Sequence, residues 1–198
     1  MNNSIISVFI DTNIIPKDST SGGHNGDLAR RLIDFCRSKA IDVRSPNGTL
    51  YDIFRNSEGP KVNSARERAK MRRSIAPIEV EEEISLSYFT PDRVRLYQIL
   101  QPAFDPSTAA YDHYRSLPEN SQSDFHNLAA AYDASWNRLT YFVAFDQDIV
   151  APERIASIEQ VARDNNKHLR IRRLSEEFLG EIRSEIEAAT NAELHLLQ

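Results

Sequence analysis

Two aspartates directly follow apolar runs of the sequence, in positions where a carboxylate can do chemistry. Asp11 follows the run 5–10, and Asp146 follows the run 141–145. Both runs are rich in β-branched and aromatic residues, which is typical of buried strands. Ligands of open parallel α/β sheets bind beyond the carboxyl ends of the strands. We therefore expect the two acids to lie at one edge of a sheet, in the place where a ligand would bind.

Two further aspartates are expected at the starts of helices near the same edge. Asp52 falls in the first turns of a helix that Thr49 can cap, and Asp124 lies at the start of a helix predicted over 121–136. Strand ends and helix starts share an edge when a crossover helix follows each strand, which this order of elements predicts. Converging carboxylates suit Mg²⁺ or Mn²⁺, because these ions prefer hard oxygen ligands. The sequence therefore predicts an acidic site for one or two such ions.

Each of these acids also has a simpler structural interpretation. Asp124 follows Ser121 at the spacing of a capping pattern, and acids are favoured near helix N-termini in any case. The same argument applies to Asp52, for whose role Glu58 competes, and Asp146 with Asp148 could form a simple turn after a strand. Asp11, at the end of a buried run, is the hardest to explain by structure alone. It is the strongest single candidate.

Hydrophobic periodicity and turn residues divide the chain into alternating strands and helices. Strands are expected at 5–10, 41–44, 141–145 and 168–174, and helices at 27–39, 49–54, 65–74, 91–101, 106–117, 121–136, 152–164 and 175–186, with 78–89 open between a strand and an irregular segment. Residues 16–26 are expected to form a loop, Pro102 to end the helix before it, and Ser175 to cap the last helix. The alternation predicts a single α/β domain over 1–198, a three-layer α/β/α sandwich with a central, mostly parallel sheet and a helical insertion at about 57–122.

The composition is that of an ordinary globular protein. The 198 residues carry a net charge of -5, and 40% of them are hydrophobic and 27% charged. Apolar runs fall well short of the roughly 20 residues of a membrane span. Residues 1–4 lack the basic region of a signal peptide, so none is expected. The single cysteine, Cys36, cannot form an internal disulfide and is expected in the core, which favours a reducing, cytoplasmic location.

One segment of this acidic chain is strongly basic. Between residues 61 and 73 the single acid Glu67 is accompanied by Lys61, Arg66, Arg68, Lys70, Arg72 and Arg73. Such a cluster can contact the phosphates of a nucleic acid. A solvated helix face with paired charges explains it equally well.

These motifs together resemble the PIN-domain nucleases. The opening signature of that family is a hydrophobic strand followed by Asp-Thr-Asn, as in residues 9–15 with Asp11. Its later signature is an Asp at the start of an Ala-rich helix, then a strand and an Asp pair, as in 123–131 and 142–148. Residues 171–179 are similar to its last strand and helix. The similar segments cover the N-terminal quarter and the region from 121 to about 186.

The resemblance implies both a site and its chemistry. The implied residues are Asp11, Asp124 and Asp146 as metal ligands, Asp148 acting through a water molecule, Asp52 as the middle acid, and Thr12 or Asn13 orienting Asp11. The implied activity is hydrolysis of phosphodiester bonds, most often in RNA, by water bound to Mg²⁺ or Mn²⁺. The expected contacts to the backbone of a single-stranded substrate are Arg66, Arg68, Lys70, Arg72 and Arg73.

Two positions depart from the family pattern. The middle acid is usually Glu, and Asp52 is one methylene shorter. The family often has Thr at the position of Ala144, whose methyl group makes no hydrogen bond. These departures motivate an alternative, a PIN-like module that has lost catalysis and binds nucleic acid or a protein. An antitoxin-like partner and a homo-oligomer are both compatible with the sequence.

Other catalytic classes fit less well. The chain has no Gly-x-x-x-x-Gly-Lys phosphate loop. Haloacid-dehalogenase-type phosphatases also begin with an Asp after a first strand, but they need a second Asp two residues on, where this chain has Asn13.

Overall fold

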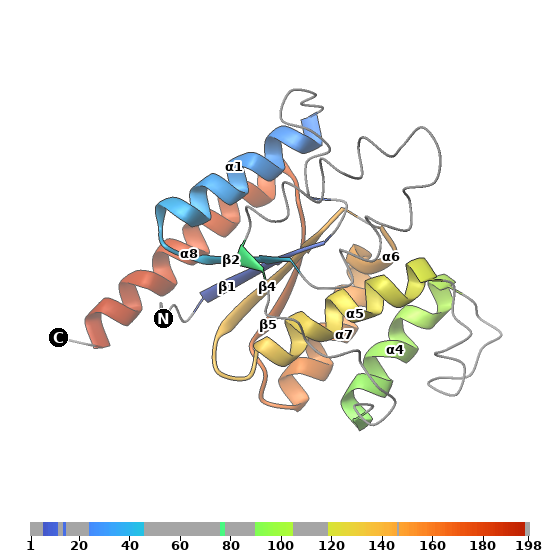
Figure 1. The fold of residues 1–198 in the computed structure, drawn as a ribbon. Coiled ribbons are helices and arrows are strands. Elements are labelled where there is room, and N and C mark those ends of the chain that lie inside the picture. Colours follow the sequence, from blue (N-terminus) through green and yellow to red (C-terminus); the bar gives the residue numbers. More distant parts are fainter. Residues whose placement is uncertain are drawn as a thin grey trace.

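A computed structural model describes residues 6–11, 14, 24–45, 76–77, 90–104, 119–145 and 147–196. The elements in these ranges are β1 (Ile6–Ile10), α1 (His24–Ser38), β2 (Asp42–Ser45), β3 (Ala76–Pro77), α4 (Pro91–Phe104), α5 (Glu119–Ala134), β4 (Leu139–Ala144), α6 (Gln147–Val150), α7 (Pro152–Asp164), β5 (Leu169–Arg173) and α8 (Glu176–Leu196). Strands and helices alternate along most of the chain, and the fold is α/β (Figure 1).

The strands form one sheet in the order β3-β2-β1-β4-β5, and every pairing is parallel. The central strand β1 pairs with β4 along its whole length, from Ile6 opposite Leu139 to Ile10 opposite Val143. All five residues of β1 are buried. A strand covered on both faces needs apolar side chains on both, which explains the continuous apolar run that predicted it.

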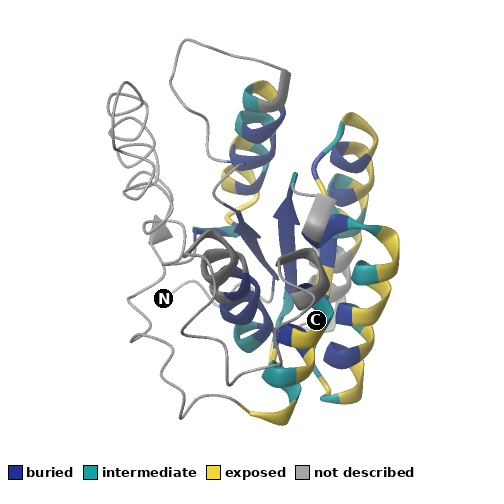
Figure 2. Cartoon of the chain, turned by 90° about the vertical axis from the view of Figure 1, so that its right-hand side faces the viewer, coloured by how far each residue is buried: buried dark blue, intermediate teal, exposed yellow. Residues whose placement is uncertain are grey.

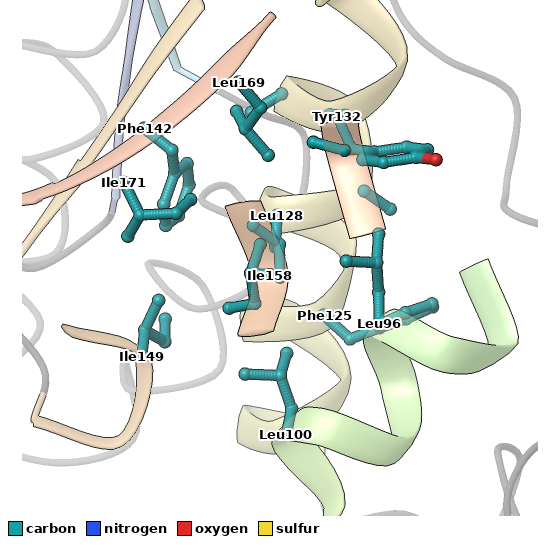
Figure 3. Packing of buried hydrophobic residues seen from close by; sticks show 14 of the residues in the cluster. Leu96, Leu100, Phe125, Leu128, Tyr132, Phe142, Ile149, Ile158, Leu169 and Ile171 are labelled. Carbon is teal, nitrogen blue, oxygen red and sulfur yellow. The ribbon is translucent and has the colours of Figure 1, made fainter. Parts of the chain in front are cut away.

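Strand alternation sends the side chains of β1 and β4 to two separate hydrophobic clusters. Val8 and Val143 pack with apolar residues of α1 and α8 on one face. Phe9 and Phe142 pack on the other face with α4, α5, α6 and α7, and Figure 3 shows this second cluster. Buried and exposed residues alternate around these helices, as amphipathic helices require (Figure 2).

The segment predicted as an insertion contributes to both the sheet and the core. β3 lies within it and pairs with β2 through Arg44 opposite Ala76. α4 also lies within it, and its buried Leu96, Tyr97 and Leu100 join the cluster around Phe142. The helices expected at 49–54, 65–74 and 106–117, and the segment 78–89, fall outside the described residues.

Several element limits differ from the sequence prediction. α1 begins at His24, so the end of the predicted loop at 16–26 is helical and Gly26 lies in the first turn. α4 continues through Pro102 to Phe104, so the prediction that Pro102 ends this helix was wrong. The proline falls in the last turn, so the helix continues only two residues beyond it. β3 and α6 span two and four residues, too few to show a hydrophobic period.

The N-terminus of α8 is capped as the sequence predicts. The Oγ of Ser175 accepts a hydrogen bond of 3.1 Å from the backbone N–H of Phe178. Beside this cap, Arg31 of α1 donates a 2.5 Å hydrogen bond to Glu176. The two helices lie side by side along one face of the sheet (Figure 1).

Side chains cover the outer edge of β5, the last strand of the sheet. The even-numbered residues of β5 bond to β4, as Leu174 N–H does to the carbonyl of Ala144, so Ile171 directs its N–H and carbonyl outward. The N–H of Ile171 donates to Oε1 of Glu159 on α7 at 2.9 Å. Nη1 of Arg172 donates both to the carbonyl of Ile171 and to the same carboxylate, each at 2.9 Å. Both outward groups of Ile171 are therefore hydrogen-bonded to side chains.

Polar contacts fasten α4 to α5. The hydroxyl of Tyr132 donates to Oδ2 of Asp92 at 2.6 Å, and Thr90 donates to the same carboxylate. Partial burial of Asp92 opposes ionisation, but these hydrogen bonds outweigh it and hold the pKa of Asp92 below its ordinary value. Arg93 and Asp133 form an ion pair beside them. α5 is thus held in place by polar contacts as well as by its apolar face.

Replacing Tyr132 with Phe should weaken this junction. The loss of a hydrogen bond to a carboxylate should lower the free energy of unfolding by about 1.5 kcal/mol near neutral pH. Because the pKa of Asp92 is depressed in the folded chain, the bond stabilises above the ordinary carboxyl pKa of about 4 and less as pH falls below it. Urea unfolding should be measured near neutral pH and at a pH below the ordinary carboxyl pKa. The loss in the free energy of unfolding relative to wild type should be smaller at the acid pH.

Tyr141→Phe is the matched control for that measurement. It removes a 2.9 Å hydrogen bond to Glu185 on the other face of the sheet and leaves Asp92 unchanged. An equal loss in Tyr132→Phe at both pH values would contradict the role given to Asp92.

Cys36 lies in the core, as expected from the apolar face of its helix. It is fully buried among the residues of α1 that pack on the sheet, and this burial raises the pKa of its thiol to about 12. The thiol should therefore not react with Ellman's reagent in the native protein near pH 8, and should react fully in denaturant. Rapid labelling of the native protein would contradict this burial, and Cys36→Ala gives the baseline.

Candidate metal site

Asp11 lies at the carboxyl end of the central strand, as the sequence predicts. Its backbone N–H donates to the carbonyl of Val143 at 3.0 Å, so the residue after β1 is still held against β4. Its own carbonyl accepts from the N–H of Ile14 at 3.1 Å. The residue is only 2% exposed. Its carboxylate is therefore buried at the edge of the sheet where ligands of parallel α/β folds bind.

The alternation of β1 decides which face of the sheet Asp11 meets. Phe9 faces the cluster that includes α5, and Ser7 bonds through its hydroxyl to Thr140 of β4 at 3.1 Å. Asp11 continues this odd-numbered series. Its Oδ1 accepts a 2.9 Å hydrogen bond from Nδ2 of Asn127 on α5, and both side chains are buried.

Asn127 was not among the residues singled out in the sequence, although it contacts the strongest candidate directly. It is fully buried, and Leu128 and Ala129 beside it are buried as well. An Asn at a buried position of an Ala-rich helix is unusual, because Asn favours helix caps over helix interiors and is mostly exposed. That pattern is the signal in the sequence that could have identified it.

The predicted ligand Asp124 lies on the same helix. It precedes Asn127 by three residues, close to one helical turn toward the N-terminal end of α5. α5 leads into β4 through the short connection 135–138, so the helix runs opposite to the strands and its N-terminal half lies near their carboxyl ends. Only the backbone of Asp124 is described.

The remaining candidates are described in part or not at all. Asp148 is in α6, directly beyond the carboxyl end of β4, and its side chain is not described. The candidates outside the described residues are Asp52, Asp146, Thr12, Asn13, Arg66, Arg68, Lys70, Arg72 and Arg73. Their roles stay predictions from the sequence.

Ala144 occupies the last position of β4 and is fully buried. It belongs to the cluster around α5, on the face toward which Asp11 points. A threonine here would place its hydroxyl on that face. The side chain of Ala144 therefore lies on the side of the sheet that holds the Asp11 carboxylate.

The described side chains do not by themselves complete a metal site. Among them, no group of three or more His, Cys, Asp or Glu residues is placed to hold an ion. The side chains of Asp124, Asp146 and Asp148 lie outside that set.

None of the helices described is both long and apolar enough to cross a membrane.

Comparison of the chain with protein-family models, with curated proteins and with solved structures found no match.

Substitution of Asp11 should separate its hydrogen bond from its charge. Asp11→Asn keeps an oxygen that can accept from Asn127, so its free energy of unfolding in EDTA should stay within about 1 kcal/mol of wild type. Asp11→Leu removes the acceptor and leaves a buried amide donor without it, which should cost about 1–3 kcal/mol. Urea unfolding of the two variants checks this, and equal stability would mean that the contact contributes nothing.

Proposed function

We propose that this chain is a metal-dependent phosphodiesterase with a PIN-like, three-layer α/β/α fold, and that it acts as a ribonuclease. The observation that carries the proposal is the carboxylate of Asp11, buried at the carboxyl end of the central parallel strand and hydrogen-bonded to the helix that bears Asp124. Such an edge is where parallel α/β folds bind their ligands.

The burial of this carboxylate supports a cationic ligand. Removing a carboxylate from water is costly unless the group is paired or coordinates a metal. A divalent cation bound at this edge would be attracted by the buried carboxylate and would accept its hard oxygen donors. The position and chemistry of Asp11 therefore fit the ion that the sequence predicts.

The positions of the other acids fit a shared ion. Asp124 is about one helical turn before Asn127, and Asp146 is two residues beyond Ala144, whose side chain lies on the α5 face. We expect these two carboxylates to converge with Asp11 and to bind the ion. Asp148 would act through a water molecule, and Asp52 would complete the set.

In this proposal each part of the chain has a defined task. A bound Mg²⁺ or Mn²⁺ supplies an activated water and neutralises the charge that develops on the phosphodiester. Asp11 is held at the end of β1 by β4 and by Asn127, so its oxygens keep a fixed position. The basic segment 61–73 would bind the phosphates of a single-stranded RNA without regard to its sequence.

A second candidate is a PIN-like module that has lost catalysis. The observation that favours it is Ala144, buried on the face of Asp11 in the place of a hydroxyl. Such a module would bind RNA or a protein partner without cleaving RNA. It differs from the nuclease in one measurable property, the release of RNA fragments.

Metal titration and RNA cleavage test the proposal together. Asp11→Asn and Asp146→Asn should each weaken Mn²⁺ binding by at least about tenfold, because each removes a charged ligand. Cleavage of single-stranded RNA should fall by at least about 100-fold, the scale seen when one charge-stabilising group is lost. Calorimetry and a fluorescent RNA substrate give the two readouts.

Asp34→Asn is the matched control, since Asp34 is an exposed acid on α1 and its substitution should change neither quantity. If Asp11→Asn cleaved RNA as fast as wild type, the proposal that Asp11 belongs to a catalytic metal site would be wrong. Binding of Mn²⁺ without cleavage of any RNA or DNA would support the non-catalytic module.

A further inference from the structure

We infer that Asn127 is a positioning residue of the proposed metal site. Its Nδ2 holds one oxygen of Asp11, and its Oδ1 would accept a hydrogen bond from water bound to the cation. The inference rests on the proposed function, because it concerns the same site. It assigns a role to a residue that the motif at 123–131 does not mark.

The orientation of the amide follows from its partner. A carboxylate only accepts hydrogen bonds, so the group of Asn127 that faces Oδ1 of Asp11 must be the NH₂ group. The 2.9 Å separation is that of a well-formed bond. With the NH₂ group committed to Asp11, the amide oxygen is fixed as well, and it is held beside the carboxylate.

That amide oxygen is the second observation. Asn127 is fully buried, and its Oδ1 accepts no hydrogen bond from the part of the chain that the structure describes. Buried polar atoms in proteins nearly always have a partner, so each exception needs an explanation. Water bound to a divalent cation is a strong donor, and an oxygen beside a metal-ligating carboxylate is where such a water would be met.

Asn127 also has the right place on its helix. It follows Asp124 by three residues, close to one helical turn, so the two positions are neighbours on the surface of α5. The bond between Asn127 and Asp11 spans 116 residues of sequence and joins α5 to β1. A change at Asn127 is therefore transmitted to both elements that carry the predicted ligands.

A purely structural tie between α5 and β1 would use the same bond, and two variants separate the roles. Asn127→Leu keeps the size of the side chain and removes both the donor and the acceptor. Ser135→Ala is the matched control. Ser135 directly follows the C-terminal end of α5 and is also fully buried, and its hydroxyl donates a 2.6 Å hydrogen bond to the carbonyl of Tyr132. Both variants should be less stable in EDTA than wild type.

Mn²⁺ binding distinguishes the two roles. Asn127→Leu should weaken Mn²⁺ binding by about 10–100-fold, the range for partners of metal ligands, and should alter the electron paramagnetic resonance spectrum of the bound ion. Ser135→Ala should change neither readout. If Asn127→Leu fails to fold, Asn127→Ser takes its place. The serine side chain is too short to keep the hydrogen bond to Asp11, and it places no bulky apolar group beside the carboxylate.

The outcomes separate this inference from the proposed function. Wild-type affinity and an unchanged spectrum in the folded Asn127 variant would overturn the positioning role and leave a structural tie, with the proposed function intact. If wild-type protein binds no Mn²⁺ even with single-stranded RNA present, the proposed function and the inference both fail.

Discussion

The parallel pairing of β1 with β4 is the constraint on which the rest of the described structure depends. Five successive residues of β1 lie opposite five of β4, and the bond from Asp11 to Val143 carries the pairing one residue beyond the strand. Since side chains of a strand alternate between faces, a slip of one residue would turn Asp11 toward α1 and α8, away from α5. The position of the carboxylate therefore depends on the register of the two most buried strands.

The same pairing also determines what Asp11 meets. The short connection from α5 to β4 lays the helix antiparallel to the strands, and apolar packing against Phe9 and Phe142 holds it there. This packing places Asn127 of α5 against Asp11 at the end of β1. The buried polar contact is thus a consequence of apolar packing around it, and the low polarity of those surroundings strengthens the bond.

The sequence predicted the parts of this fold whose signals are local. Buried strands show as continuous apolar runs, which placed β1 and β4, and the limits of α7 and the cap at Ser175 were predicted correctly because each depends on adjacent residues. Asp11 was expected at the edge of the sheet for the same reason, and its position is confirmed. The start of α1 and the passage of α4 through Pro102 were missed, since Gly26 and Pro102 are residue types that usually mark loops and helix ends.

The contact to Asn127 is of another kind. It joins residues 116 positions apart in the sequence. No pattern within α5 indicates that one of its side chains contacts a carboxylate at the end of β1. Residue type and burial together were the only local sign. Roles that depend on partners outside the described residues, such as those of Asp52 and Asp146, stay predictions.

The hydrogen bonds that Glu159 and Arg172 make to Ile171 have a consequence for the chain in a crowded solution. An uncovered margin of a sheet is a template on which a strand of a second molecule can add, and repeated addition leads to fibrous aggregates. The two side chains occupy the hydrogen-bonding groups of Ile171, in the middle of β5, that an incoming strand would need. Glu159 is delivered by α7, a helix of 13 residues. Resistance of the outer edge of β5 to self-association therefore depends on the local stability of α7. Local unfolding of α7 would expose this edge before the rest of the domain unfolds.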